Sequence, residues 1–170
     1  MEKNNLNVTF KGGAVTLLGK VAKVGDVAPD FTALSSSLEA VKLSDYNGKV
    51  RVIAVYPSID TGICAAQNRR FNQEANNMKD VVVLSVSVDL PFAQSRFCAA
   101  EGLNNIVTLS DHKDLDFGSK YGFVIKELRL LARGTVIIGK DNKIKYVEYV
   151  PEIAQEPDYD AAMKVVKELL

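Results

Sequence analysis

The sequence has no excess of charge, because 21 Lys and Arg residues are matched by 21 Asp and Glu residues. Nucleic-acid binding requires a surplus of Lys and Arg on one face, so we expect no nucleic-acid partner. The sequence also lacks any run of the roughly 20 consecutive apolar residues that a membrane helix needs. The polar opening, residues 1–10, has none of the charged, apolar and small-residue pattern of a secretory signal. These absences predict a cytoplasmic protein with no membrane association.

The sequence also has few of the residues that form zinc sites, and it has no nucleotide-binding motif. The chain has two cysteines and one histidine, whereas a zinc site uses about four ligands. The histidine, His112, lies in a polar segment typical of a surface turn, which disfavours a Cys-His hydrolase. Neither G-x-G-x-x-G nor a P-loop occurs, so the sequence implies no nicotinamide or nucleotide cofactor. We therefore expect a chemistry that needs no metal and no cofactor.

The composition predicts an ordinary folded domain. Hydrophobic residues make up 47% and charged residues 25% of the 170 positions, which is the globular range. This length is typical of one domain, and we interpret residues 1–170 as a single domain. A chain of this size builds a core without disulfide bonds. Both cysteines are therefore available for chemistry.

Hydrophobic patterning predicts an α/β protein with a central mixed sheet. Residues 7–17 alternate around a Gly-Gly pair, which indicates an N-terminal β-hairpin. Residues 50–56 and 81–88 are β-branched runs typical of buried strands. Residues 64–78 between them have helical spacing, so the three segments form a βαβ unit with parallel strands.

The second half of the chain continues this alternation. Pro91 suits the first turn of a helix, which Gly102 is expected to end. The pattern predicts further elements in order: a strand at 106–109, a helix at 114–121, an antiparallel hairpin formed by 135–138 and 143–150, and a helix that opens at residues 157–158. Helices on a mixed sheet make a layered α/β architecture.

Cys64 follows the loop after the first buried strand and opens the helix. The unpaired N–H groups and the positive dipole of a helix start favour an anion, and the thiolate is the nucleophilic form of cysteine. Thr61 stands three residues earlier, so its hydroxyl can turn back towards the sulfur. Pro57 fixes the direction of the loop. The plainer alternative for Cys64 is a buried small hydrophobic residue.

The residues around both cysteines resemble a known family. Pro57, Thr61 and Cys64 reproduce the P-x-x-x-T-x-x-C signature of peroxiredoxins, and the string PSIDTGIC at 57–64 is similar to the active-site loop of the bacterial thiol peroxidases. The string DLPFAQSRFC at 89–98 looks like the segment that carries the resolving cysteine in the same subfamily. The resemblance covers essentially the whole chain, and it implies a thioredoxin-like (peroxiredoxin) fold.

The resemblance also implies the roles of individual residues. Cys64 would be the peroxidatic cysteine, and Cys98 would capture its sulfenic acid as an intramolecular disulfide. Arg133 matches the arginine that orients the peroxide, although Arg129 is close enough to be confused with it. The plainer alternatives are a core position for Cys98 and a solvated charge at a strand edge for Arg133.

The implied activity is thiol-dependent reduction of hydrogen peroxide and alkyl or lipid hydroperoxides, with thioredoxin as the electron donor and a homodimer as the assembly. No cofactor is implied, because the sulfur itself is oxidised and reduced. Disulfide formation should require local unwinding, because both cysteines lie in or near helices and their Cα atoms must come within about 7 Å. The alternative function is a redox sensor that passes oxidation to a partner protein. A disulfide exchanger is disfavoured because the chain has no Cys-x-x-Cys.

Overall fold

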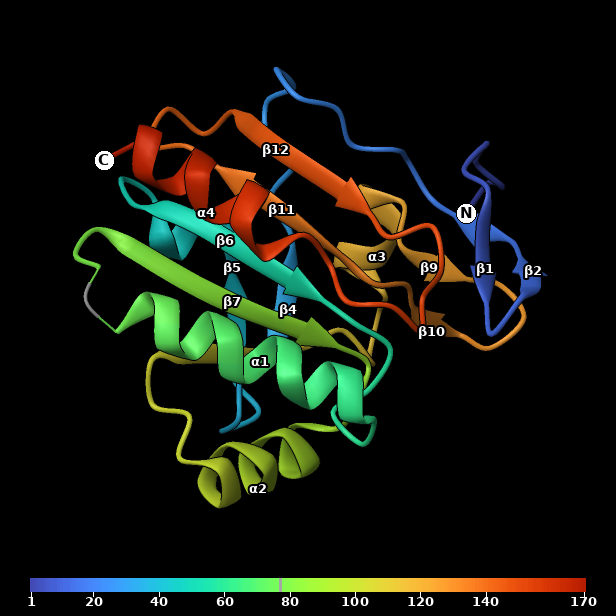
Figure 1. Ribbon diagram of the computed structural model, residues 1–170, viewed down its shortest axis with the longest axis horizontal. Coiled ribbons are helices and arrows are strands. Elements are labelled where there is room, and N and C mark those ends of the chain that lie inside the picture. Colours follow the sequence, from blue (N-terminus) through green and yellow to red (C-terminus); the bar gives the residue numbers. More distant parts are fainter. Residues whose placement is uncertain (77) are drawn as a thin grey trace.

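The computed structural model describes residues 1–76 and 78–170, and in this part of the chain the dominant feature is a seven-stranded sheet. Its strand order is β12-β11-β6-β7-β8-β4-β5 (Figure 1). In chain order these strands are β4 (Thr32–Leu34), β5 (Ala40–Lys42), β6 (Val50–Val55), β7 (Val81–Ser87), β8 (Ile106–Ser110), β11 (Gly134–Ile138) and β12 (Ile144–Tyr149). The sheet is mixed, because β6, β7 and β8 run parallel and the other pairings are antiparallel.

Shorter elements surround this sheet. The N-terminal hairpin pairs β1 (Val8–Phe10) with β2 (Gly13–Val15), as predicted. A small antiparallel sheet contains β3 (Leu17–Leu18), β9 (Val124–Ile125) and β10 (Leu130–Leu131). The helices are α1 (Gly62–Ala75), α2 (Pro91–Glu101), α3 (Asp116–Tyr121), α4 (Tyr159–Glu168) and the short 3-10 helix η1 (Leu43–Tyr46). Within the described residues, no helix combines the length and apolar character needed to cross a membrane.

The helices cover both faces of the sheet. Helices α1, α2 and α4 pack on one face, against a core that includes Val52, Val83 and Ile137. Helix α3 packs on the opposite face, where Phe117 and Tyr121 stack with ring centroids 4.8 Å apart. The strands of the sheet centre are therefore buried on both sides, which explains their continuous apolar runs.

The predicted βαβ unit is confirmed, with small differences at its ends. Strands β6 and β7 are parallel, and α1 connects them. The helix begins two residues before Cys64, because the Thr61 hydroxyl accepts a hydrogen bond from the Cys64 amide and so caps the helix at Thr61. The predicted helix extends past Ala75 through Asn77, which lies outside the described residues, to Met78, which is not helical.

The later elements are confirmed as well. Helix α2 begins at Pro91 and ends before Gly102, whose φ of 66° is the left-handed conformation that glycine favours at this position. The hairpin of β11 and β12 closes one edge of the sheet. Strands β4 and β5 at the opposite edge were not predicted, because they are only three residues long and flank a serine-rich turn.

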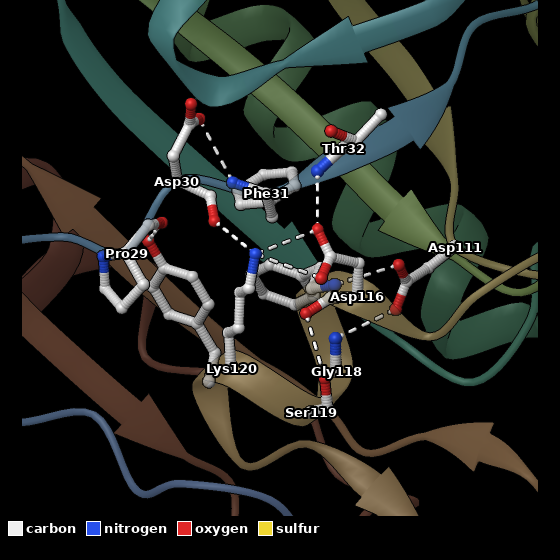
Figure 2. A network of polar contacts seen from close by, with 11 residues as sticks. Pro29, Asp30, Phe31, Thr32, Asp111, Asp116, Gly118, Ser119 and Lys120 are labelled. Carbon is white, nitrogen blue, oxygen red and sulfur yellow. Dashed lines mark hydrogen bonds and ion pairs between the residues drawn. The ribbon is translucent and has the colours of Figure 1, made fainter.

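Two carboxylates fix the start of α3 (Figure 2). The Asp116 carboxylate accepts hydrogen bonds from the Thr32 amide at 2.8 Å and the Lys120 ammonium at 3.2 Å, which ties β4 to the helix. The Asp111 carboxylate accepts the amides of Phe117 and Gly118 at 3.0 and 2.9 Å. Asp111 is buried, and burial raises its pKa from 3.8 to about 6 despite these hydrogen bonds.

This raised pKa predicts a pH-dependent contribution to stability. Between pH 4 and 6 the folded state holds a proton on Asp111 that the unfolded state has lost, so the unfolding free energy falls as pH rises through this window. Asp111→Asn removes this titration. We expect the difference in unfolding free energy, wild type minus variant, to fall by about 2 kcal/mol between pH 4 and 7 in urea titrations. A difference that stays constant with pH would contradict the assignment.

Candidate active site

Cys64 lies at the third position of α1, beyond the carboxyl end of β6. Its side chain is 0% exposed and packs with Tyr56 and Ile59 in a small apolar cluster. Ala93 and Phe97 of α2 pack against the same cluster. Cys64 is a free thiol. The structure therefore places a reduced cysteine in the first turn of a helix, where partial positive charge gathers, and shields it with a second helix.

The loop before Cys64 is held by the Thr61 hydroxyl. This hydroxyl accepts a hydrogen bond from the Cys64 amide at 3.3 Å and donates one to the Ser58 carbonyl at 3.2 Å. Thr61 does turn back towards Cys64, as expected, and the contact it makes is with the backbone amide. Pro57 is buried two residues after the end of β6. Together these residues fix the entry of the chain into α1.

Arg133 is only 2% exposed, so the alternative of a solvated charge at a strand edge is wrong. Its Nε donates to the Ile153 carbonyl at 2.7 Å, and its Nη1 donates to the Gln67 Oε1 at 2.9 Å. Gln67 lies on α1 three residues after Cys64, and such residues share one helix face. By contrast, Arg129 is exposed and donates to the His112 carbonyl. The buried arginine is therefore the one that the structure ties to α1.

Sequence reasoning missed a buried polar layer beneath α1. Gln67 and Asn68 are both buried. The Asn68 Nδ2 donates to the Cys64 carbonyl at 2.9 Å, and the Asn68 Oδ1 accepts from the Ser85 Oγ at 2.6 Å. Burial raises the pKa of Tyr56, whose hydroxyl lies 2.6 Å from the same Ser85 Oγ. Two adjacent amide side chains on the sheet-facing side of a predicted helix are the signal that could have revealed this layer.

Cys98 lies near the end of α2 and is partly buried. It is a free thiol that packs against the core beneath α1 and α4, and not with the Cys64 cluster. Burial raises the pKa of Cys98, and a hydrogen bond with Thr108 opposes this effect. A hollow of about 280 Å³ adjoins the thiol, with Ser95 and Thr108 in its lining. The structure brings the neighbouring Phe97, and not Cys98, against the Cys64 cluster.

Two aromatic residues near the cysteine segments, Tyr56 and Phe92, are placed differently. Tyr56 packs against Cys64, but the Phe92 side chain is 64% exposed. The helical turn of α2 explains the difference, because Ala93 and Phe97 lie four residues apart on the side that faces α1, and Phe92 points away from it.

Comparisons with known proteins show similarity in both sequence and fold. The Redoxin family model matches residues 23–163. A thiol peroxidase of Oceanobacillus iheyensis is 57% identical over 157 residues, which cover 92% of this chain and 96% of that protein. A thiol peroxidase of Bacillus subtilis is 53% identical over 163 residues, covering 96% and 98%. A solved peroxiredoxin-like protein from Aquifex aeolicus is 39% identical, covers 100% of both chains and superposes with a TM-score of 0.92.

The fold is therefore that of the peroxiredoxins, and the predicted fold class is confirmed. The central mixed sheet, the flanking helices and the N-terminal hairpin are all present. The chain belongs to the Redoxin family and, within it, to the thiol peroxidases, a class of thiol-dependent peroxidase enzymes.

Proposed function

We propose that this chain is a single-domain peroxidase, residues 1–170, that reduces hydrogen peroxide and alkyl or lipid hydroperoxides with Cys64 as its nucleophile. The observation that carries the proposal is the placement of Cys64 in the capped first turn of α1, one helical turn before the Gln67 that holds Arg133. A helix start and a guanidinium supply positive charge where a thiolate and a peroxide need it.

In the first step the Cys64 thiolate attacks one oxygen of the peroxide. The O–O bond breaks, and the other oxygen takes up a proton and leaves as water or an alcohol. The sulfur is oxidised by two electrons to a sulfenic acid. Arg133 and Thr61 orient the peroxide, and Pro57 holds the loop that shapes the site.

In the second step the Cys98 thiol attacks the sulfenic sulfur of Cys64. An S–S bond forms, the S–O bond breaks, and water leaves with the Cys98 proton, so the disulfide protects Cys64 from irreversible oxidation. The raised pKa of Cys98 supports these separate roles. It keeps Cys98 a protonated thiol, which disfavours Cys98 as the residue that attacks peroxide. The separate packing of the two thiols means that α1, α2 or both must unwind locally.

A dithiol reductant must return two electrons to the disulfide, and we propose thioredoxin for this role. Such recycling requires a reducing compartment, which supports a cytoplasmic location. A homodimer is the proposed assembly. Leu90 and Phe92, large apolar side chains exposed at the start of α2, support it, because such residues mark interaction surfaces where they gather. Sedimentation of a monomer at micromolar concentration would contradict the dimer.

The test is peroxide consumption by the purified protein, coupled to thioredoxin and its reductase, with hydrogen peroxide and cumene hydroperoxide as substrates. We expect steady turnover with at least one of them, and loss of turnover when thioredoxin is omitted. A single oxidation without turnover would favour the alternative of a redox sensor. No oxidation of Cys64 at all would contradict the proposed peroxidase mechanism.

A further inference from the structure

Along the chain, Asp89 lies between α1 and α2, the two helices that carry the cysteines. It follows β7 by two residues and precedes the first residue of α2 by two. The Ser110 hydroxyl donates to its backbone carbonyl at 2.5 Å, which fixes this residue to the end of β8. Asp89 therefore stands at the carboxyl edge of the sheet, where the loop that leads to Cys64 also begins.

The Asp89 carboxylate binds the Cys64 loop, which is the segment 56–61 between β6 and α1. It accepts hydrogen bonds from the Ser58 hydroxyl at 2.7 Å and from the Ile59 amide at 2.9 Å. Ser58 in turn offers its carbonyl to the Thr61 hydroxyl, which caps the Cys64 amide. A continuous series of hydrogen bonds thus connects Asp89 to the first turn of α1. Hydrogen bonds to a charged acceptor are the stronger kind, so this carboxylate is the strongest acceptor in the series.

The same carboxylate is also connected by hydrogen bonds to Gln94, a buried residue of α2. It accepts a hydrogen bond from the Ser87 hydroxyl at 2.6 Å, and that hydroxyl accepts one from the Gln94 amide at 3.2 Å. Gln94 lies one helical turn before Cys98 on α2 and also donates to the Leu109 carbonyl. The Gln94 Oε1 is buried without a hydrogen-bond partner among the described residues, so the polar contacts that hold α2 against the sheet are incomplete.

We propose that Asp89 is a positioning residue that holds the Cys64 loop in its peroxide-reactive conformation and opposes the unwinding that the disulfide requires. The inference rests on the proposed peroxidase function. Cys64 reacts with peroxide while α1 is wound and capped, whereas it reaches Cys98 only after this turn is released. A residue that stabilises the wound state must therefore accelerate the first step and slow the second.

The test is Asp89→Asn, which keeps the size of the side chain and removes its charge. An asparagine has one acceptor oxygen, so it cannot accept from Ser58, Ile59 and Ser87 as the carboxylate does. We expect the rate constant for Cys64 oxidation by hydrogen peroxide to fall about tenfold, and the rate constant for disulfide formation to rise several-fold. The yield of sulfinic acid at high peroxide should fall as well. Stopped-flow competition and rapid alkylation with mass spectrometry measure these quantities.

Asp116→Asn is the matched control. Asp116 also holds a backbone amide, that of Thr32, with its carboxylate, but it does so at α3 on the opposite face of the sheet (Figure 2). We expect this variant to leave both rate constants unchanged. If Asp89→Asn folds poorly, Ser58→Ala removes one of the three carboxylate contacts and should shift both rate constants in the same directions by smaller factors.

Opposite changes of the two rate constants in Asp89→Asn, with both unchanged in Asp116→Asn, would support the assignment, because loss of a carboxylate elsewhere in the domain would then affect neither step. Rate constants that both stay within about twofold of wild type, or that fall together, would overturn it. The proposed function fails separately, if the wild-type Cys64 does not react with peroxide in the same experiment.

Discussion

Replacing Cys64 with serine should lower peroxide turnover by a factor on the order of 10⁴ or more. A serine hydroxyl stays protonated and is a weak nucleophile without an adjacent general base, whereas cysteine is intrinsically the stronger nucleophile of the two. The measurement is the thioredoxin-coupled assay with hydrogen peroxide and cumene hydroperoxide.

Cys98→Ser is the matched variant, because it removes the second thiol and leaves the first site intact. We expect it to lose steady turnover and to keep one rapid oxidation per chain. The sulfenic acid of Cys64 should then accumulate and convert to sulfinic acid at high peroxide, since no thiol captures it. Mass spectrometry distinguishes these products. Peroxide consumption at the wild-type rate by Cys64→Ser would show that the nucleophile is misassigned.

Replacing Arg133 with lysine should lower kcat/KM for peroxide about 100-fold. The guanidinium uses Nε for the Ile153 carbonyl and Nη1 for the Gln67 side chain, and an ammonium cannot reproduce that fixed geometry. The positive charge then lies away from the developing charge on the peroxide. We also expect the unfolding free energy to fall by roughly 1–3 kcal/mol, because a buried acceptor loses its donor.

The alkylation rate of Cys64 by iodoacetamide separates catalysis from structure in this variant. That reaction needs the thiolate but no arginine to polarise an O–O bond, so it should fall much less than the peroxide rate. Arg129→Lys is the control, since Arg129 is exposed and contacts only the His112 carbonyl among the described residues. Equal peroxide rates for wild type and Arg133→Lys would contradict the role of Arg133.

Much of the fold follows from local sequence patterns. The continuous apolar runs of β6 and β7 give a parallel pair, Pro91 and Gly102 bound α2, and Asp158 caps α4. Strands β4 and β5 escaped detection because, unlike the equally short β1 and β2, they are not joined by a Gly-Gly turn. The pairing of β4 is selected by the neighbouring strand β8, which is distant in sequence.

The candidate site divides in the same way. The order of Pro57, Thr61 and Cys64 along one short loop determined the capped first turn of α1, because a cap and the amide that it binds are three residues apart. The burial of Arg133 and its contact with Gln67 depend on β11 lying beside β6, so no local pattern contains them. The same holds for Asp89, which meets Ser58 only because β6 and β7 end side by side. Local spacing therefore identified the residue that we propose as the nucleophile, and strand pairing decided which distant side chains hold the elements around it.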